Sequence, residues 1–311
     1  MDNSLRAKLE EISHGEVLFD CPLAPYTSFA IGGPADALLV IKRKEDLAHL
    51  LNFFHNESLR WRVFGKGSNL LVNDAGFRGV VLQLAGEFAQ IAEASVVGEN
   101  RLTVGVGAGC SLTKLNHHCC RQGLGGMVFS YGIPGTVGGA LLMNAGAWGK
   151  QMADLVVDVG LITAKGYEKL AVKPGDFRYR NWSSFAAYIG RGIIVDVTLA
   201  LTSAHPSQLQ GEAKELLRKR KVLQPHNYPN AGSVFKNPQG DSAGRLIDEC
   251  GLKGESVGGA MVSTKHGNFI INNNKATATD VLTLIARVQH GVKKRFCVDL
   301  ELEIHVLGAS G

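Results

Sequence analysis

The chain has 311 residues, of which 33 are basic and 28 acidic, so its net charge is only +5. This length predicts two domains, and the weak positive charge argues against a dedicated nucleic-acid binder. Glycine is abundant, with 38 residues and no repeating period. That pattern excludes a collagen-like chain and indicates tight turns or backbone that lies directly against a ligand.

The sequence contains no feature that predicts export or a place in a membrane. Charged residues begin at Asp2, and no uncharged apolar run approaches the ~20 residues that span a bilayer. The cysteines form no CxxC pair and fit buried reduced thiols in a cytosolic protein; they are Cys21, Cys110, Cys119, Cys120, Cys250 and Cys297. We therefore expect a cytoplasmic protein without a membrane partner.

The first 200 residues predict a mixture of helices and strands. A helix over 4–13 comes first, and a βαβ-like unit follows, with strands at 37–41, 62–64 and 79–84 and an amphipathic helix at 47–54. Strand candidates at 88–96 and 102–108 precede a helix that Ser111 caps. After a long glycine-rich loop, strands are expected at 155–163, 168–172 and 193–201.

A change of composition at residues 202–206 predicts a domain boundary. Beyond it we expect helices near 208–222 and 242–250. A longer helix begins at a capping box formed by Thr277 and Asp280, and a final strand covers about 300–307.

Two glycine-rich loops are the candidates for ligand binding. The first, Gly65 to Asn69, could present N–H groups to a pyrophosphate, but it matches neither the Rossmann nor the P-loop pattern. A plain turn is an equal alternative for that loop. The second, Gly132 to Gly149, mixes glycine with apolar residues and is unlike a flexible linker. It favours backbone packed against a cofactor over a purely structural loop.

Taken together, these segments resemble the UDP-N-acetylenolpyruvoylglucosamine reductase family. Residues 65–80 read GKGSNLLVNDAGFRGV and are similar to the family's GxGSNLLV-x-D-x-G segment. Residues 132–149 are similar, without a gap, to its GIPG[ST]VGGA-x-x-MNAGA[YW]G signature, and residues 26–36 resemble its N-terminal segment. The resemblance covers essentially the whole chain, in order.

The resemblance implies an α+β fold with two domains. An FAD-binding domain of the vanillyl-alcohol-oxidase type is expected at 20–205, in two subdomains split near 85, and a smaller α+β substrate-binding domain at 206–311. The implied reaction is NADPH-dependent reduction of UDP-N-acetylglucosamine enolpyruvate to UDP-N-acetylmuramate through bound FAD, in peptidoglycan synthesis. We expect a monomer or weak dimer that binds no nucleic acid.

The resemblance also implies which residues contact FAD. In the first loop they are Gly65, Lys66, Gly67, Ser68, Asn69 and Leu70; in the second they are Pro134, Gly135, Thr136, Gly138, Gly139, Asn144, Ala145 and Gly146. Many members carry a small residue where this chain has Lys66, and that difference affects only the expected loop contacts.

Three residues match the family's catalytic positions. The resemblance of NAGSVFKNP to a family motif implies that Ser233 is the proton donor. Without the motif, a serine in a turn would usually form only local hydrogen bonds. The resemblance of FRYR to the family's YR motif implies that Arg180 binds the substrate carboxylate, with Arg178 as the alternative. Glu303 has the family's spacing to the glycine that follows it, whereas Glu301 does not.

For the substrate's pyrophosphate, the resemblance implies contacts from Lys221 and Asn237. From the residues alone, the basic run 218–221 would be a solvated helix face. The chain resembles the form that lacks a long tyrosine-bearing insertion, because the short stretch between Arg180 and Ile193 has no room for one.

Two other functions stay open at this point. One is a different FAD-dependent oxidoreductase of the same fold, acting on a small hydroxy acid or sugar. The other is a non-enzymatic nucleotide or nucleic-acid binder that uses the run 218–221. No metal site is expected at residues 117–120, two histidines and two cysteines, because adjacent helix residues face different directions and the spacing fits no zinc pattern.

Overall fold

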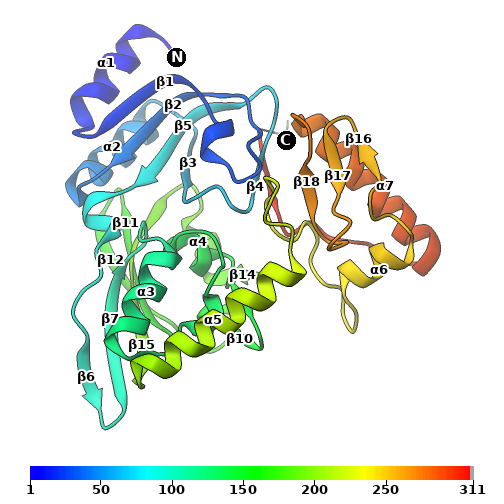
Figure 1. Cartoon of the computed structure of the whole chain (residues 1–311). Coiled ribbons are helices and arrows are strands. Elements are labelled where there is room, and N and C mark those ends of the chain that lie inside the picture. Colours follow the sequence, from blue (N-terminus) through cyan, green and yellow to red (C-terminus); the bar gives the residue numbers. More distant parts are fainter. Residues whose placement is uncertain (309–311) are drawn as a thin grey trace. The chain divides into compact units, whose positions relative to one another are not determined.

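The computed structural model describes residues 1–308 (Figure 1). The chain packs as two compact units. The first comprises Met1–Phe19, Asp36–Gly65 and Gly79–Arg218, and the second comprises Asp20–Ala35, Lys66–Arg78 and the residues from Lys219 onward. The division expected from the sequence, an FAD-binding domain at 20–205 and a substrate-binding domain at 206–311, stays a prediction.

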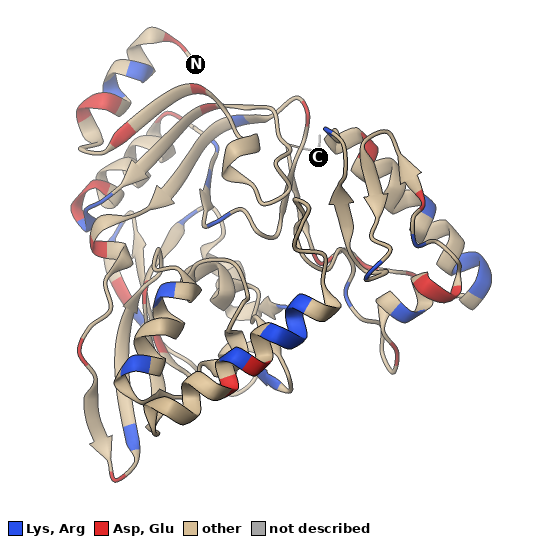
Figure 2. Cartoon of the chain, viewed as in Figure 1, with Lys and Arg blue, Asp and Glu red and all other residues tan. Residues whose placement is uncertain are grey.

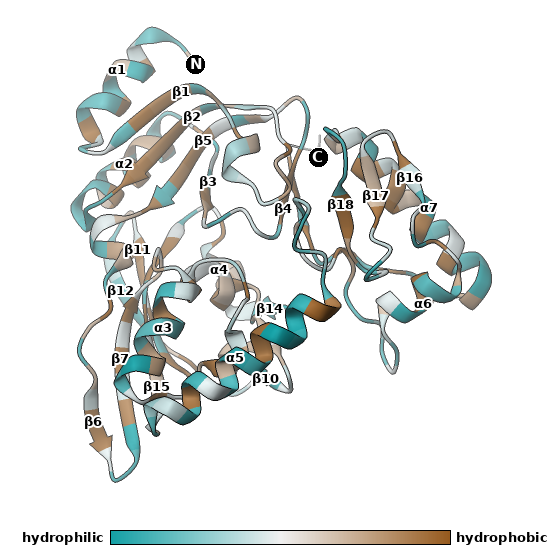
Figure 3. Cartoon of the chain, viewed as in Figure 1, coloured by the Kyte–Doolittle hydropathy of each residue, from teal (hydrophilic) through white to brown (hydrophobic). Residues whose placement is uncertain are grey.

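The first unit begins with a sheet of strand order β1-β2-β5-β3. Its elements are α1 (Asn3–Ile12), β1 (Glu16–Pro22), β2 (Pro34–Ile41), α2 (Lys44–Asn56), β3 (Trp61–Phe64) and β5 (Phe77–Leu84). Helix α2 buries Leu47, Leu50 and Phe54. Their spacings of three and four residues place them on one face of the helix. They share a core with residues of β2 and β5, two strands that are largely apolar in Figure 3.

A second sheet of the first unit has the order β12-β11-β15-β7-β6, with β8 paired to β15. The strands are β6 (Ser95–Gly98), β7 (Arg101–Gly107), β8 (Leu124–Gly125), β11 (Val156–Thr163), β12 (Gly166–Ala171) and β15 (Gly192–Ser203). They pair antiparallel, with β15 between β11 and β7. Helices α3 (Leu112–Gln122) and α4 (Val137–Leu142) contribute to the core of this sheet.

Shorter elements complete the first unit. These are the strand pairs β9 (Gly146–Ala147) with β10 (Lys150–Gln151) and β13 (Phe177–Arg178) with β14 (Asn181–Trp182), and the 3-10 turns η2 (Gly86–Ala89), η3 (Val128–Ser130), η4 (Met152–Asp154) and η5 (Ser183–Tyr188). Helix α5 (Pro206–Leu223) buries Leu209 and Ala213 against Cys120 of α3. Its basic residues gather toward its C-terminal end (Figure 2).

The second unit packs a long helix against a small sheet. Its elements are η1 (Ala24–Tyr26), β4 (Leu70–Val72), α6 (Ala243–Glu249), β16 (Ser256–Val257), β17 (Ala260–Val262), β18 (Ile270–Asn272), α7 (Ala278–Phe296) and β19 (His305–Leu307). Strands β16, β17 and β18 form one sheet, and β4 pairs with β19 in parallel. The expected capping box of α7 is confirmed, because Thr277 and Asp280 exchange side-chain-to-backbone hydrogen bonds.

Three local expectations are wrong. Residues 88–96 are not one strand, because the turn η2 buries Phe88 and regular pairing begins only at Ser95. Residues 300–307 are regular only from His305 onward, in β19. Cys250 is only partly buried and Cys297 is exposed, whereas the other four cysteines are buried, and all six are free thiols.

Candidate functional site

In the first unit, the two glycine-rich loops meet at Gly65 and Thr136. Gly65 directly follows β3, and a Cβ placed on it would lie 2.5 Å from the Thr136 hydroxyl oxygen. That hydroxyl also caps α4 by accepting a hydrogen bond from the Gly139 N–H at 3.3 Å. Glycine at position 65 is therefore required by the close approach of the second loop.

The remainder of the first loop belongs to the second unit. Gly67 has a left-handed φ of +59°, and a Cβ there would overlap the Tyr26 carbonyl oxygen. Within residues 1–308, the backbone N–H groups of Lys66, Gly67 and Asn69 donate to no other protein group. Successive unpaired N–H groups form a concavity that suits an anion. These residues therefore fit the pyrophosphate of a dinucleotide such as FAD.

The second loop packs its backbone directly against β7 and the residues that follow it. The Gly138 N–H donates to the Ala108 carbonyl at 2.8 Å, and a Cβ on Gly138 would lie 3.0 Å from the Ala108 side chain. Gly135 has a φ of +136°, and its carbonyl accepts a hydrogen bond from the Leu112 N–H at 3.0 Å. Of the other expected FAD contacts here, Pro134 and Gly139 are exposed, and Ala145 and Gly146 are half-buried. The second loop is thus packed against the protein at Gly135 and Gly138 and exposed at Pro134 and Gly139.

Asn144, in contrast, is buried, with 1% of its surface exposed. Its Nδ2 donates to the Gln151 side chain at 3.0 Å and to the Arg178 carbonyl at 3.1 Å, and its Oδ1 accepts from the Ala153 N–H at 3.0 Å. The Asn144 amide thereby links three segments of the first unit.

Arg180 lies at the tip of the hairpin formed by β13 and β14. Its backbone has a left-handed φ of +56°, and its guanidinium lies 4.9 Å from the centroid of the Tyr179 ring. Its Nη2 donates to the Gly146 carbonyl at 3.4 Å. Arg180 is half-buried, whereas Arg178, the alternative, is exposed. The structure therefore places Arg180 beside the expected FAD loop.

In the second unit, the segment that contains Ser233 lies beside the segment that contains Glu303. The Glu303 N–H donates to the Val234 carbonyl at 2.8 Å, and Phe235 forms an antiparallel bridge with Leu302. Ser233 is half-buried, and its hydroxyl has no hydrogen-bond partner among residues 1–308. The hydroxyl is therefore available to a ligand.

Glu303 also lies beside the first glycine loop. The Asn69 side chain donates to the Glu303 carbonyl at 2.9 Å, and the His305 N–H donates to the Asn69 carbonyl at 2.9 Å. Glu303 is half-buried, whereas the Glu301 side chain is 75% exposed and pairs with Lys236 at 3.2 Å. The second unit thus brings together Asn69, Glu303 and the segment that contains Ser233, through one side-chain and several main-chain hydrogen bonds.

Asn268 is a supporting residue that the sequence did not indicate. It is 3% exposed, its Oδ1 accepts from the Phe235 N–H at 2.9 Å, and its Nδ2 donates to the Phe235 carbonyl at 2.8 Å. These bonds fix the segment that follows Ser233. No motif marks a single asparagine of this kind, so only its contacts identify it.

Lys221 and Asn237 are both exposed in the second unit. The Lys221 carbonyl, near the end of α5, accepts hydrogen bonds from the side chains of His226 and Lys265, each at 2.7 Å. The Asn237 Oδ1 accepts from the Ala243 N–H at 3.1 Å, at the start of α6. The Lys221 ammonium is free to meet an anion, whereas the Asn237 side chain also has a structural partner.

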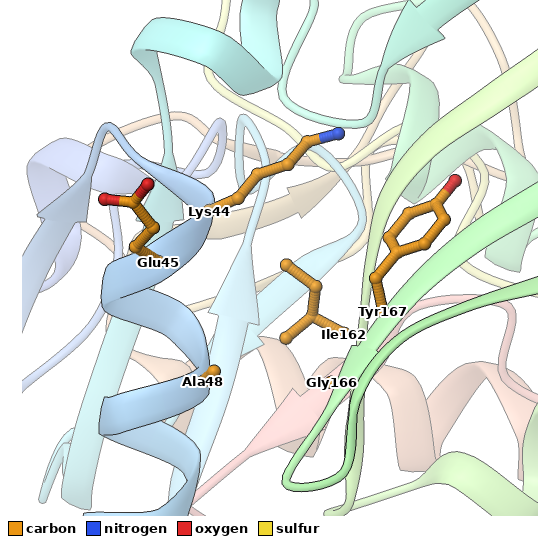
Figure 4. Close-up of a pocket in the computed structure, with 6 residues that line it drawn as sticks. All are labelled: Lys44, Glu45, Ala48, Ile162, Gly166 and Tyr167. Carbon is orange, nitrogen blue, oxygen red and sulfur yellow. The ribbon is translucent and has the colours of Figure 1, made fainter.

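A separate pocket of about 330 Å³ in the first unit contains none of the expected site residues. It is lined by Lys44, Glu45, Ala48, Ile162, Gly166 and Tyr167 (Figure 4). The Lys44 ammonium and the Tyr167 hydroxyl both contact the Asp196 carboxylate, at 3.0 and 3.1 Å. Because these groups already satisfy one another, the pocket offers little to a polar ligand.

Residues 1–308 contain neither a metal-binding group of side chains nor a helix suited to span a membrane. No group of three or more histidine, cysteine, aspartate or glutamate side chains is placed to hold a metal ion. None of the helices in this part of the chain is both long and apolar enough to cross a membrane. At residues 117–120, His117 packs against the Tyr131 ring and Cys119 lies in the core, so this cluster has a structural role.

Comparison with known proteins gives two family matches. The FAD binding domain family matches residues 35–169, and the C-terminal domain family of UDP-N-acetylenolpyruvoylglucosamine reductase matches residues 224–307. The two matches fall on different parts of the chain and together cover most of it. The FAD-binding domain and the reductase family that the sequence predicts are both confirmed.

Similar full-length proteins agree with these matches. The UDP-N-acetylenolpyruvoylglucosamine reductase 2 of Symbiobacterium thermophilum is 49% identical over 92% of this chain and 91% of its own length. The reductase of Syntrophus aciditrophicus is 40% identical over 100% of this chain and 98% of its own length. A crystal structure of the reductase from Thermus caldophilus superposes on this chain with a TM-score of 0.77. The match covers 94% of this chain and 99% of the Thermus chain, at 37% sequence identity. The expected α+β fold class is thereby confirmed.

Proposed function

We propose that this chain, which belongs to the UDP-N-acetylenolpyruvoylglucosamine reductase family, reduces UDP-N-acetylglucosamine enolpyruvate to UDP-N-acetylmuramate with FAD and NADPH. The observation that carries the proposal is the presence on one chain of an FAD binding domain match at 35–169 and a reductase C-terminal match at 224–307. The product is a precursor of peptidoglycan, so the enzyme acts in cell-wall synthesis. Nothing in the comparisons favours a different flavin enzyme or a nucleic-acid binder.

Bound FAD supplies hydride transfer between NADPH and the enolpyruvyl group. The residues that would hold its pyrophosphate are Lys66, Gly67 and Asn69, whose backbone N–H groups have no other partner within residues 1–308. The backbone of the second glycine loop, from Pro134 to Gly146, would contact the remainder of the cofactor. In this proposal Lys66 contributes through its backbone, so its long side chain does not obstruct the site.

Arg180 binds the enolpyruvyl carboxylate. Reduction of the double bond places negative charge on that carboxylate, and a guanidinium can stabilise it through two parallel N–H···O bonds. The contacts of Arg180 with the Gly146 carbonyl and the Tyr179 ring support this role, because they fix the guanidinium before substrate arrives. The exposed Arg178 has no comparable support.

Ser233 donates the proton that completes the reaction. Its hydroxyl gives a proton to the α-carbon, and general acid help of this kind contributes ~10²–10⁴-fold. The free hydroxyl of Ser233 supports this assignment. Glu303, in its protonated form, donates a hydrogen bond to the substrate carboxylate. The bond from its backbone N–H to the Val234 carbonyl holds it beside the Ser233 segment.

Lys221 and Asn237 bind the substrate's pyrophosphate. The Lys221 ammonium lies on an exposed helix end and neutralises charge there, and the Asn237 amide adds a hydrogen bond. We place the reaction in the cytoplasm, because NADPH and nucleotide sugars are available there. We also expect a monomer or weak dimer.

The proposal is tested on purified protein with the visible spectrum as the readout. The protein should be yellow and release intact FAD on denaturation. Under anaerobic conditions NADPH should bleach the flavin, and UDP-N-acetylglucosamine enolpyruvate should restore the colour with one equivalent of product. Small hydroxy acids serve as the control substrates. A flavin that NADPH does not bleach, or that the UDP-sugar does not reoxidise, contradicts the proposal.

A further inference from the structure

The segment 144–146 holds the hairpin that carries Arg180 through two hydrogen bonds, in addition to the burial of Trp182 in the core. Asn144 donates to the Arg178 carbonyl at 3.1 Å, and the Gly146 carbonyl accepts from the Arg180 guanidinium at 3.4 Å. The hairpin itself contributes only two paired positions on each strand, with Arg178 opposite Asn181. A two-stranded ribbon this short is not stable alone, so its position depends on such outside contacts.

Asn144 is suited to this task by its backbone as well as its side chain. Its φ is +39°, a left-handed value that asparagine tolerates better than most side chains. Both hydrogens of its amide are donated, one to Gln151 and one to Arg178, and its oxygen accepts from Ala153. A buried amide with this many bonds holds its partners firmly, because breaking one bond leaves a polar group unsatisfied.

We propose that Asn144 is a positioning residue, which holds the Arg178 carbonyl so that the Arg180 guanidinium is fixed toward the substrate carboxylate. This role differs from the FAD contact that the family resemblance implies for Asn144, because both amide hydrogens are already donated within the protein. The inference rests on the carboxylate-binding role proposed for Arg180. It concerns the second half of the reaction and not the binding or reduction of the flavin.

The substitution Asn144→Asp removes the hydrogen bond to Arg178. An aspartate keeps the acceptor for the Ala153 N–H, but it donates neither to the Arg178 carbonyl nor to Gln151, whose side chain also accepts from the Asp154 N–H. The Arg178 carbonyl then faces an oxygen instead of a donor. Gln151→Glu is the matched control, because it adds a carboxylate at the same place while Asn144 can still donate to both neighbours. Asn144→Gly, which accepts the left-handed φ, provides a second test should the aspartate variant fold poorly.

Two readouts are measured on the flavin-loaded proteins. The first is the rate of trypsin cleavage after Arg178 and Arg180, followed by mass spectrometry, which reports the mobility of the hairpin without reference to activity. We expect an increase of about tenfold in Asn144→Asp and none in Gln151→Glu, the size expected from the loss of one buried hydrogen bond. Equal cleavage in the two variants overturns the inference.

The second readout separates the two half-reactions by anaerobic stopped flow. In Asn144→Asp, reoxidation by the UDP-sugar should slow about tenfold or more, and by a larger factor than bleaching by NADPH. Loss of both half-reactions together overturns a positioning role. Arg180→Ala is measured in parallel: unchanged reoxidation there refutes the proposed role of Arg180, while the cleavage rates still decide whether Asn144 holds the hairpin.

Discussion

The side-chain amide of Asn69 donates a hydrogen bond of 2.9 Å to the main-chain carbonyl of Glu303. One residue belongs to the first glycine loop and the other to the C-terminal segment, and the parallel pairing of β4 with β19 continues the contact. An expected FAD-binding residue and an expected catalytic residue are thus joined by protein bonds alone. We expect changes at Asn69 to affect both the stability and the site.

Asn69→Ala removes this bond and leaves the Glu303 carbonyl without that donor. The free energy of unfolding in urea should fall by about 1 kcal/mol, the usual contribution of one such bond. Asn227→Ala is the control, because Asn227 is exposed in the same unit and its replacement should stay within about 0.5 kcal/mol of wild type. Equal stabilities of the two variants would show that the bond contributes nothing.

Two glycines with similar φ values, Gly67 and Gly240, separate the effect of a close contact from that of backbone strain. Gly67 and Gly240 have φ values of +59° and +79°, but a Cβ meets the Tyr26 carbonyl at the first position and nothing within 4 Å at the second. Gly67→Ala should therefore lower the melting temperature and the FAD content clearly. Gly240→Ala should cost only the left-handed strain, about 1 kcal/mol. Similar losses in both variants would mean that strain, and not contact, explains the glycine.

Asp74 makes stability depend on pH. Partial desolvation raises the pKa of Asp74, but hydrogen bonds from the Thr279 side chain and from the Ala278 and Thr279 N–H groups outweigh this effect and hold the pKa below its usual value of 3.8. The unfolded chain therefore takes up this proton first. The stabilisation that ionised Asp74 adds to the folded protein is fully present well above pH 3.8. It is lost as the pH falls below that value.

This is checked with Asp74→Asn by urea unfolding between pH 3 and pH 7. At pH 7 the variant should be destabilised by about 0.5–2 kcal/mol, the range for a capping residue, toward the lower end because Asp74 is exposed. The difference from wild type should shrink as the pH approaches 3. A difference that stays constant over this range contradicts the assigned pKa.

The free thiols should differ sharply in reactivity. Burial raises the pKa of Cys119 to about 12, whereas Cys297 is exposed. At pH 7.5 a maleimide should therefore modify Cys297 first in the folded protein and leave Cys119 unmodified until the protein is unfolded in urea. Peptide mass spectrometry measures the order. Early modification of Cys119 in the folded state would refute its burial.

Much of the fold could be predicted because its longer elements carry strong local patterns. The stripe Leu47, Leu50 and Phe54 marked α2, and the capping residues Ser111 and Thr277 marked the starts of α3 and α7. Strands of two or three residues, such as β13 and β16, are too short for any alternation to identify them. Their positions come from tertiary contacts.

The site could be predicted only as a set of residue types in motifs. The motifs gave Arg180 and Ser233, but not the left-handed turn at Arg180 or the free Ser233 hydroxyl. Asn144 carried an expected cofactor contact, and its bonds to Gln151 and Arg178 could not be read from the chain. A side chain's partners depend on segments distant in sequence, so no local pattern encodes them.

The proposed reaction is tested most directly by anaerobic stopped flow on Ser233→Ala, with each half-reaction followed at the flavin absorbance. In this variant NADPH should bleach the bound flavin at close to the wild-type rate. Reoxidation by UDP-N-acetylglucosamine enolpyruvate should slow by ~10²–10⁴-fold, because the α-carbon then lacks its proton donor. Reoxidation at the wild-type rate would show that Ser233 is not the proton donor.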